Sequence, residues 1–276
     1  MAFRAVLRDS CNTCWCIMST LGCTSALVRF APRSGATVRL LCIPFAGGGA
    51  SAFRLWSAGL PPMVDVMVAQ LPGRETRLRE RPLTSIGAMV EHLRPAVTAH
   101  ADLPFAIFGH SMGALVGLEL ARALRADGLP GPVHLFVSAS NPPRRRETDL
   151  PPLHTLPDDA LVAELDRRYG GVPAAVREQR ELMELLLPML RGDVTALETY
   201  RARELPPLDC PITAYAGSSD ALATPESMRG WGLETSGRFH ARTFDGGHFF
   251  INTHRDPLLA DVLAALAPAG AREGAA

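Results

Sequence analysis

Short apolar runs alternate with amphipathic segments along most of this chain. The apolar runs are typical of buried β-strands, and they lie at residues 37–44, 64–69, 105–109, 132–138 and 211–216. A further strand pattern lies at residues 238–244. The segments between them favour helices, which we expect at residues 51–58, 84–100, 112–127 and 257–266. Repeated strand–helix units of this kind predict an α/β fold with a mostly parallel, doubly wound sheet.

The alternation stops in residues 141–208, which contain several prolines and no strand pattern. Helical spacing returns there at residues 158–168, 174–190 and 193–203. We interpret this region as a helical lid, inserted into a core formed by residues 28–140 and 209–267. We expect the insertion to leave and rejoin the sheet at one edge, and so to fold over that edge. Gly170, Gly171 and Gly192 are predicted to separate its helices and to act as hinges.

The two ends of the chain lack this periodicity. Residues 1–27 are predicted to be a disordered extension, with Met18 as an alternative start, and residues 268–276 a disordered tail. Four of the six cysteines lie within the first 23 residues. The other two lie in or beside predicted strands, and this layout favours a reduced, cytoplasmic protein over a disulfide-stapled one.

Length and composition limit the kind of protein and the partners that this chain can have. A chain of 276 residues with 47% hydrophobic content can bury the core of one large domain. Its net charge of zero favours neither nucleic acid nor an anionic membrane as a partner. The most apolar window, residues 105–124, contains His110, Ser111 and Glu119, which argues against a membrane span. We expect a monomer without a metal ion or other cofactor.

The pentapeptide Gly-His-Ser-Met-Gly at residues 109–113 lies between a predicted strand and a predicted helix. A Gly-x-Ser-x-Gly turn in that setting is the nucleophile elbow of serine hydrolases, in which glycines allow a turn too tight for side chains. The following helix directs its positive N-terminus toward an oxyanion formed there. We therefore predict that Ser111 is a nucleophile.

A serine nucleophile needs a base and an orienting acid, which in this fold follow in the order serine, acid, histidine. Of the five histidines after Ser111, only His248 lies in a glycine-containing loop just past the last predicted strand. Asp220 follows the preceding strand at the same sheet edge, whereas Asp209 lies at the wrong end of that strand. Asp149 is the one rival, because some hydrolases place their acid one strand earlier.

Backbone N–H groups are the expected oxyanion donors. One should come from Met112, directly after the nucleophile, and another from the turn at residues 45–47. The glycines at 47–49 would let that turn approach a substrate closely.

Four segments resemble those of one known family. They are Ile-Pro-Phe-Ala-Gly-Gly-Gly at 43–49, Gln-Leu-Pro-Gly-Arg-Glu at 70–75, the elbow at 109–113, and Gly-Gly-His-Phe-Phe at 246–250. Together they resemble the type II thioesterases, which are discrete editing hydrolases of polyketide and nonribosomal peptide biosynthesis. The elbow is shared with many esterases, whereas the second and fourth segments are more specific. The resemblance covers about residues 28–266.

This resemblance implies an α/β-hydrolase fold with a mobile helical lid. It places a catalytic triad on Ser111, Asp220 and His248, and the second oxyanion donor on Ala46. It also implies hydrolysis of acyl groups held on the phosphopantetheine arm of an acyl carrier or peptidyl carrier protein, through an acyl-enzyme.

Further interpretations stay open. Met183 and Leu186 are candidate substrate-binding residues under the lid, although apolar residues at helical spacing are more often packing. A stand-alone carboxylesterase would share the triad, but more often shows His-Gly-Gly-Gly where this chain has Phe-Ala-Gly-Gly at 45–48. A chain-releasing thioesterase would share the chemistry, but is normally fused to a synthase.

Overall fold

The computed structural model describes residues 25–145, 151–170 and 179–267. Within these residues the strands form one seven-stranded sheet, in the order β1-β3-β2-β4-β5-β6-β7. The strands are β1 (Leu27–Val28), β2 (Val38–Ile43), β3 (Val64–Ala69), β4 (Phe105–His110), β5 (Leu135–Ser138), β6 (Ile212–Gly217) and β7 (Phe239–Phe244). All neighbouring pairs are parallel except β1 and β3. The predicted α/β fold is therefore confirmed.

Helices connect the strands. The α-helices are α2 (Trp56–Gly59), α3 (Ile86–Thr98), α4 (Met112–Ala126), α5 (Asp158–Tyr169), α7 (Arg180–Thr199), α8 (Pro225–Met228), α9 (Phe250–Thr253) and α10 (Arg255–Leu266). The 3-10 turns are η1 (Ala50–Phe53), η2 (Glu75–Arg77), η3 (Pro143–Arg145), η4 (Leu153–Thr155) and η5 (Arg229–Glu234).

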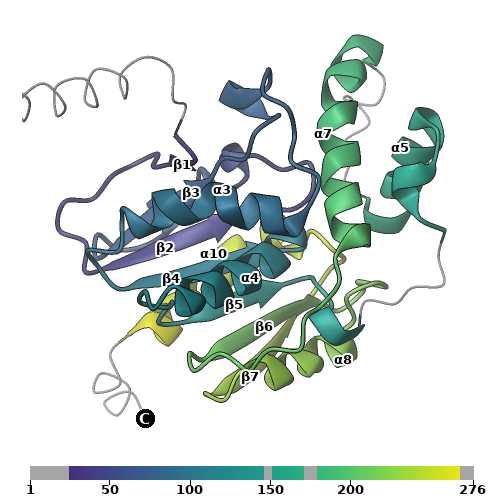
Figure 1. Cartoon of the computed structure of the whole chain (residues 1–276). Coiled ribbons are helices and arrows are strands. Elements are labelled where there is room, and N and C mark those ends of the chain that lie inside the picture. Colours follow the sequence, from purple (N-terminus) through teal and green to yellow (C-terminus); the bar gives the residue numbers. More distant parts are fainter. Residues whose placement is uncertain (1–24, 146–150, 171–178, 268–276) are drawn as a thin grey trace, which may run out of the picture.

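The two faces of the sheet are buried against different helices, as in a doubly wound fold (Figure 1). In β2, Leu41 and Ile43 pack with α3 and α4, whereas Leu40 and Cys42 pack with α2 and α10. This division follows from the two-residue period of a strand. Because both faces are covered, the strands β2 to β6 are buried along their whole length, whereas the edge strand β7 is mostly exposed.

The edge strand β1 was not predicted from the sequence. It contains two residues, which is too short to give an alternating pattern. Leu27 pairs with Ala69 of β3 and is buried, so regular structure begins one residue inside the predicted 1–27 extension. Residues 1–24 and the predicted tail at 268–276 lie outside the described residues.

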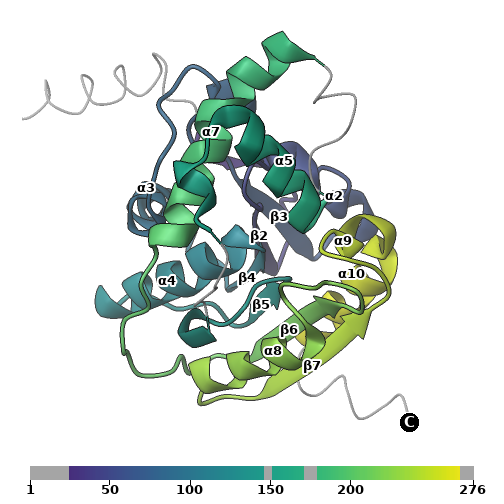
Figure 2. The same cartoon turned by 90° about the vertical axis from the view of Figure 1, so that its right-hand side faces the viewer.

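The helices α5 and α7 stand together beyond one end of the sheet (Figures 1 and 2). They share a small apolar cluster of their own, separate from the two clusters that flank the sheet. The loop after β2 contacts α7 and the loop after β7 contacts α5, so this end is the carboxyl edge of the parallel strands. The inserted helices therefore cover the edge where the sequence places the site.

One prediction about the insertion is wrong at Gly192, which does not separate two helices. Helix α7 runs without a break from Arg180 to Thr199. A Cβ atom on Gly192 would lie 3.2 Å from the backbone oxygen of Leu83 and 3.2 Å from Cβ of Pro82. The glycine therefore lets α7 approach the loop before α3 closely, and it is not a hinge.

The insertion also does not rejoin the sheet at the edge where it leaves. Because β6 is parallel to β5, it begins at the opposite, amino edge. After α7 the chain descends beside α4. The hydroxyl of Tyr200 donates to Glu119, and Arg125 donates to the carbonyl oxygens of Pro206 and Pro207. The insertion is therefore held over the site by the contacts of α5 and α7. The positions of its two ends do not explain its placement.

In the part of the chain that the structure describes, no helix combines the length and apolar character needed to cross a bilayer.

Candidate active site

Ser111 occupies a strained turn between β4 and α4. Its backbone has φ 54° and ψ −114°, a conformation that is costly for a residue with a Cβ atom. The Ser111 N–H donates to the carbonyl oxygen of Ser138 at 2.7 Å, which helps to hold the turn. This strand–turn–helix arrangement exposes the serine hydroxyl at the carboxyl edge, as a nucleophile elbow does.

The two glycines of the elbow are required by close backbone contacts. A Cβ atom on Gly109 would lie 2.2 Å from the carbonyl oxygen of Gly113. A Cβ atom on Gly113 would lie 2.0 Å from the carbonyl oxygen of Ile43, at the end of β2. Both distances are far inside van der Waals contact, so only glycine allows α4 to begin this close to the sheet.

Two loops bring an imidazole and a carboxylate to Ser111. His248 follows β7, and its Nε2 lies 3.0 Å from Oγ of Ser111. Asp220 follows β6, and its Oδ2 lies 2.8 Å from Nδ1 of the same imidazole. Both residues are buried, with 8% of His248 and 5% of Asp220 exposed. The structure thus brings all three predicted triad residues into one hydrogen-bonded chain.

The carboxylate of Asp220 is fixed on both oxygens. Its Oδ1 accepts the N–H groups of Leu222 and Ala223, each at 3.0 Å, while Oδ2 faces His248. Burial acts to raise the pKa of Asp220. The bonds from the imidazole and the two N–H groups outweigh burial, so this pKa lies below its usual value. The group is therefore an ionised acceptor that orients the imidazole.

The other residues considered for the acid and the base either lie away from Ser111 or fall outside the described residues. Asp149 lies outside the described residues, and Asp209 lies before β6 at the opposite edge. His134 bonds to Thr213, and His154 bonds to Glu198.

The predicted oxyanion donors lie in two adjacent segments. Met112 is the first residue of α4, and Ala46 lies in the loop after β2. Among the described residues, neither the Ala46 N–H nor the Met112 N–H has a hydrogen-bond acceptor. Both N–H groups therefore stay predicted oxyanion donors.

His110 is a fully buried imidazole below the site. Its Nδ1 lies 2.9 Å from Oγ of Ser138, and its ring lies 5.4 Å from that of His248 and 5.8 Å from that of Phe45. Burial, helped by the nearby His248, holds the pKa of His110 well below its usual value. His110 is therefore a neutral packing residue that supports the imidazole above it.

The two predicted substrate residues lie in the apolar cluster between α5 and α7. Met183 is buried there, and Leu186 is partly buried against it. Two other residues of the insertion touch the site directly, and the sequence did not single them out. The ring of Tyr169 lies 4.9 Å from that of His248, and Leu190 packs on Gly47.

In the three described segments of the chain, no group of three His, Cys, Asp or Glu side chains is placed to hold a metal ion.

The fold and the geometry at Ser111 together define a hydrolase of the α/β-hydrolase class. Comparison with known proteins gives the family. The family model of the thioesterase domain matches residues 38–266, and the chain belongs to this family. It is a hydrolase that acts on thioesters.

Three of the similar proteins are named for biosynthetic pathways. The gramicidin S biosynthesis protein GrsT of Aneurinibacillus migulanus is 42% identical over 221 residues, which cover 79% of this chain and 85% of GrsT. The structure of BorB, a type II thioesterase from the borrelidin biosynthetic cluster, has a TM-score of 0.80 at 40% identity, covering 87% of this chain and 97% of BorB. RedJ, a thioesterase of the prodiginine pathway in Streptomyces coelicolor, has a TM-score of 0.79 at 41% identity, covering 90% and 99%. The predicted resemblance to type II thioesterases is confirmed.

Proposed function

We propose that this protein hydrolyses acyl thioesters held on the phosphopantetheine arm of a carrier protein, as an editing type II thioesterase. The hydrogen-bonded chain from Asp220 through His248 to Ser111 carries the chemical part of this proposal. The carrier-protein part is supported by similarity to type II thioesterases of biosynthetic clusters, among them YbtT of the yersiniabactin NRPS/PKS pathway.

In the proposed reaction, His248 accepts the hydroxyl proton of Ser111 through Nε2 while Oγ attacks the thioester carbon. The N–H groups of Ala46 and Met112 stabilise the oxyanion. The C–S bond breaks, the proton on Nε2 of His248 passes to the departing sulfur, the thiol of the pantetheine arm leaves, and the acyl group stays on Oγ. Water then attacks the acyl-enzyme with His248 as its base, which releases the carboxylic acid and restores the serine.

In this proposal the insertion at 141–208 is a lid over the site. Tyr169 of α5 lies against His248, so it restricts the approach to Ser111. Movement of α5 away from His248 would widen the approach to Ser111.

The test compares substrates that differ only in the carrier. Purified protein is given propionyl and hexanoyl groups on a phosphopantetheinylated carrier protein, the same acyl groups on N-acetylcysteamine, and the matching ethyl esters. We expect the highest kcat/KM on the carrier-bound thioesters, and none of the activities in Ser111→Ala. Equal kcat/KM on the ethyl esters would identify a carboxylesterase instead. A full-length assembled acyl chain on a carrier protein is tested alongside, and turnover confined to it would identify a releasing thioesterase.

A further inference from the structure

A second buried charge pair lies next to the candidate oxyanion donors. Arg74 belongs to the Gln-Leu-Pro-Gly-Arg-Glu segment, and Asp193 belongs to α7. Arg74 Nη2 donates to Asp193 Oδ1 at 2.8 Å, and Nη1 donates to Oδ2 at 3.0 Å. The pair is almost inaccessible, with 2% of Arg74 and none of Asp193 exposed. A two-point bond of this kind fixes the orientation of both groups.

The carboxylate of Asp193 also holds the loop after β2. Its Oδ2 accepts the N–H of Gly47 at 2.7 Å. Arg74 Nη1 donates in addition to the carbonyl oxygen of Gly48 at 3.0 Å. The same charge pair therefore binds the two residues that directly follow Ala46.

The loop itself is a tight turn. The Gly48 N–H donates to the carbonyl oxygen of Phe45 at 2.9 Å, and Gly47 has φ 80°. A positive φ at the third residue is the mark of a type II turn, in which the second residue, Ala46, keeps its N–H outside the turn bond. The Ala46 N–H lies in the same peptide plane as the Phe45 carbonyl, which accepts the turn bond from Gly48, so its direction depends on the turn being kept.

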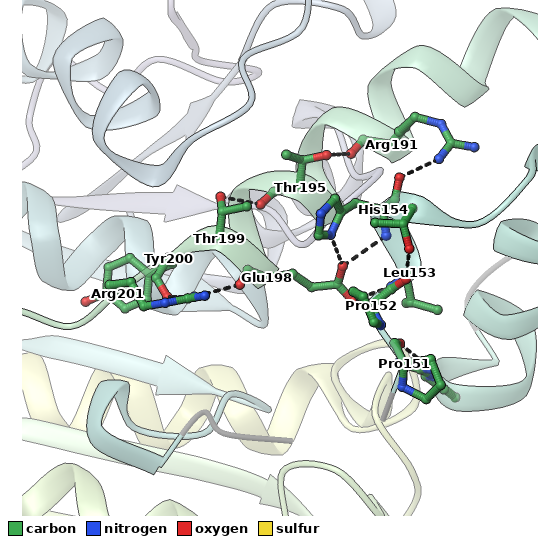
Figure 3. Close-up of polar contacts among 12 residues, drawn as sticks. Pro151, Pro152, Leu153, His154, Arg191, Thr195, Glu198, Thr199, Tyr200 and Arg201 are labelled. Atoms are coloured by element: carbon green, nitrogen blue, oxygen red, sulfur yellow. Dashed lines mark hydrogen bonds and ion pairs between the residues drawn. The ribbon is translucent and has the colours of Figure 1, made fainter. Parts of the chain in front are cut away.

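The part of α7 that carries Asp193 is itself anchored (Figure 3). Glu198 accepts the N–H groups of Leu153 and His154 at 2.7 and 2.9 Å, and its Oε2 lies 2.6 Å from Nδ1 of His154. Arg191 Nη1 donates to the carbonyl oxygen of His154 at 2.7 Å. These bonds fix the last turns of α7 against the segment before α5, so Asp193 is presented from a rigid element.

We propose that Arg74 and Asp193 are positioning residues, which hold the turn at residues 45–48 so that the Ala46 N–H points at the oxyanion. This inference rests on the proposed function, because it assigns a role to the same site. An oxyanion donor stabilises the transition state only if it is already oriented, so the group that orients it affects kcat more than KM.

The positive charge of Arg74 also affects the electrostatics of the oxyanion site. A lone carboxylate beside the oxyanion site would oppose the negative charge that develops there. Burial raises the pKa of Asp193, and the Arg74 guanidinium and the Gly47 N–H oppose that rise. The guanidinium thus neutralises the carboxylate locally, and Asp193 can bind Gly47 without repelling the oxyanion.

The test is Asp193→Asn, with Glu234→Gln as the matched control. Glu234 is a buried carboxylate that pairs with Arg122 at 2.6 Å, on the side of the fold away from the turn at 45–48. The introduced asparagine has one oxygen in place of two, so it cannot accept both Gly47 and the two-point bond of Arg74. We expect kcat on hexanoyl-N-acetylcysteamine to fall about 10- to 100-fold in Asp193→Asn with KM changed less than about 3-fold. Glu234→Gln should keep kcat within about 3-fold of wild type, because the turn at 45–48 is untouched.

A transition-state mimic gives a readout independent of turnover. A trifluoromethyl ketone adds to a serine hydroxyl and places an oxyanion in the hole, so its affinity should fall in Asp193→Asn by the same factor as kcat/KM. Its binding is measured by protection of Ser111 from a fluorophosphonate probe. Unchanged kcat and unchanged inhibitor affinity in a folded Asp193→Asn would overturn the inference.

Arg74→Lys decides the question if Asp193→Asn does not fold. Lysine keeps the charge but loses the two-point bond, so kcat should fall and KM should be nearly constant. Full kcat in this variant would also overturn the inference. If wild-type protein failed to cleave any thioester, the proposed function would be wrong, while the inhibitor measurements would still judge the positioning role.

Discussion

Asp220→Asn tests the assignment of the acid, because the surroundings of this side chain determine how an asparagine would sit. Two backbone N–H groups, from Leu222 and Ala223, point at Oδ1. An asparagine must place its carbonyl oxygen there, since its NH2 group would leave two buried donors unpaired at about 1–3 kcal/mol each. Its NH2 group therefore occupies the position of Oδ2, 2.8 Å from Nδ1 of His248.

This orientation reverses the proton arrangement of the imidazole. Nδ1 of His248 must then accept from the introduced NH2 group, so the imidazole proton moves to Nε2. Nε2 lies 3.0 Å from Oγ of Ser111 and would face it as a donor, unable to act as base. We expect kcat to fall by about 10³- to 10⁴-fold, which corresponds to about 4–5.5 kcal/mol in the activation free energy. KM should change little, because no substrate contact is removed.

The assay follows thiol release from an acyl-N-acetylcysteamine thioester, alongside the rate of fluorophosphonate labelling of Ser111. Asp209→Asn is the control, since it removes an exposed carboxylate before β6. Activity above about a tenth of wild type in a folded Asp220→Asn would refute the reasoning, because a triad that lacks its acid loses far more than that. Loss of activity in Asp149→Asn instead would show that the acid comes from the preceding strand.

The same substitution should also change how stability depends on pH. Because the pKa of Asp220 is lowered in the folded protein, this carboxylate stabilises the fold above its unfolded pKa of about 3.9. That contribution is lost as the pH falls through the folded pKa. The difference in Tm between wild type and Asp220→Asn should thus be largest near neutral pH and should shrink below about pH 4. A constant difference across this range would contradict the linkage.

Three other predictions concern separate parts of the molecule. Gly113→Ala should lower Tm by several degrees, because the introduced Cβ would lie 2.0 Å from the carbonyl oxygen of Ile43. An unchanged Tm in thermal unfolding would contradict this close contact. Burial lowers the pKa of His110, so its neutral form adds stability above about pH 6.5 that is lost toward lower pH. Urea unfolding at about pH 7 and about pH 5.5 should show a smaller loss of stability in His110→Gln than in wild type, and equal losses would refute this. Replacing Met183 or Leu186 by tryptophan should lower kcat/KM on decanoyl more than on propionyl thioesters if the acyl chain enters the cluster between α5 and α7, and equal losses would mean that these side chains only pack the insertion.

Local patterns in the sequence predicted the sheet, the elbow and most helix boundaries. A strand buried on both faces is an apolar run, and a helix has its own period, so these elements are visible in any short window. The prediction of β3 at residues 64–69 matches the strand in the structure residue for residue. Ser111 and His248 were found in the same way, since each lies in a glycine-containing loop just after a predicted strand.

The sequence was less informative where the role of a residue depends on a contact with a residue far away along the chain. Gly192 suggested a hinge, whereas the structure shows a helix pressed against the loop at residues 82–84. The return of the chain to the amino edge before β6 follows from the parallel direction of β5 and β6. The mostly parallel sheet predicted from the sequence already required it, so the expectation of one shared edge was wrong.

Six of the seven strands in the described residues, the elbow, and the loops that carry the candidate triad could be predicted from the chain alone. The two-residue strand β1 and the place of each strand in the sheet could not. The predicted features depend on periodicity and on turn residues, which act over a few positions. The meeting of Arg74 and Asp193, which are 119 residues apart, became visible only in the folded molecule. The sequence analysis marked Arg74 only as part of the segment at residues 70–75, and it did not single out Asp193. A buried charge needs a partner, but sequence alone does not say which of the chain's many arginines supplies it, because that choice depends on the packing of α7 against the sheet edge.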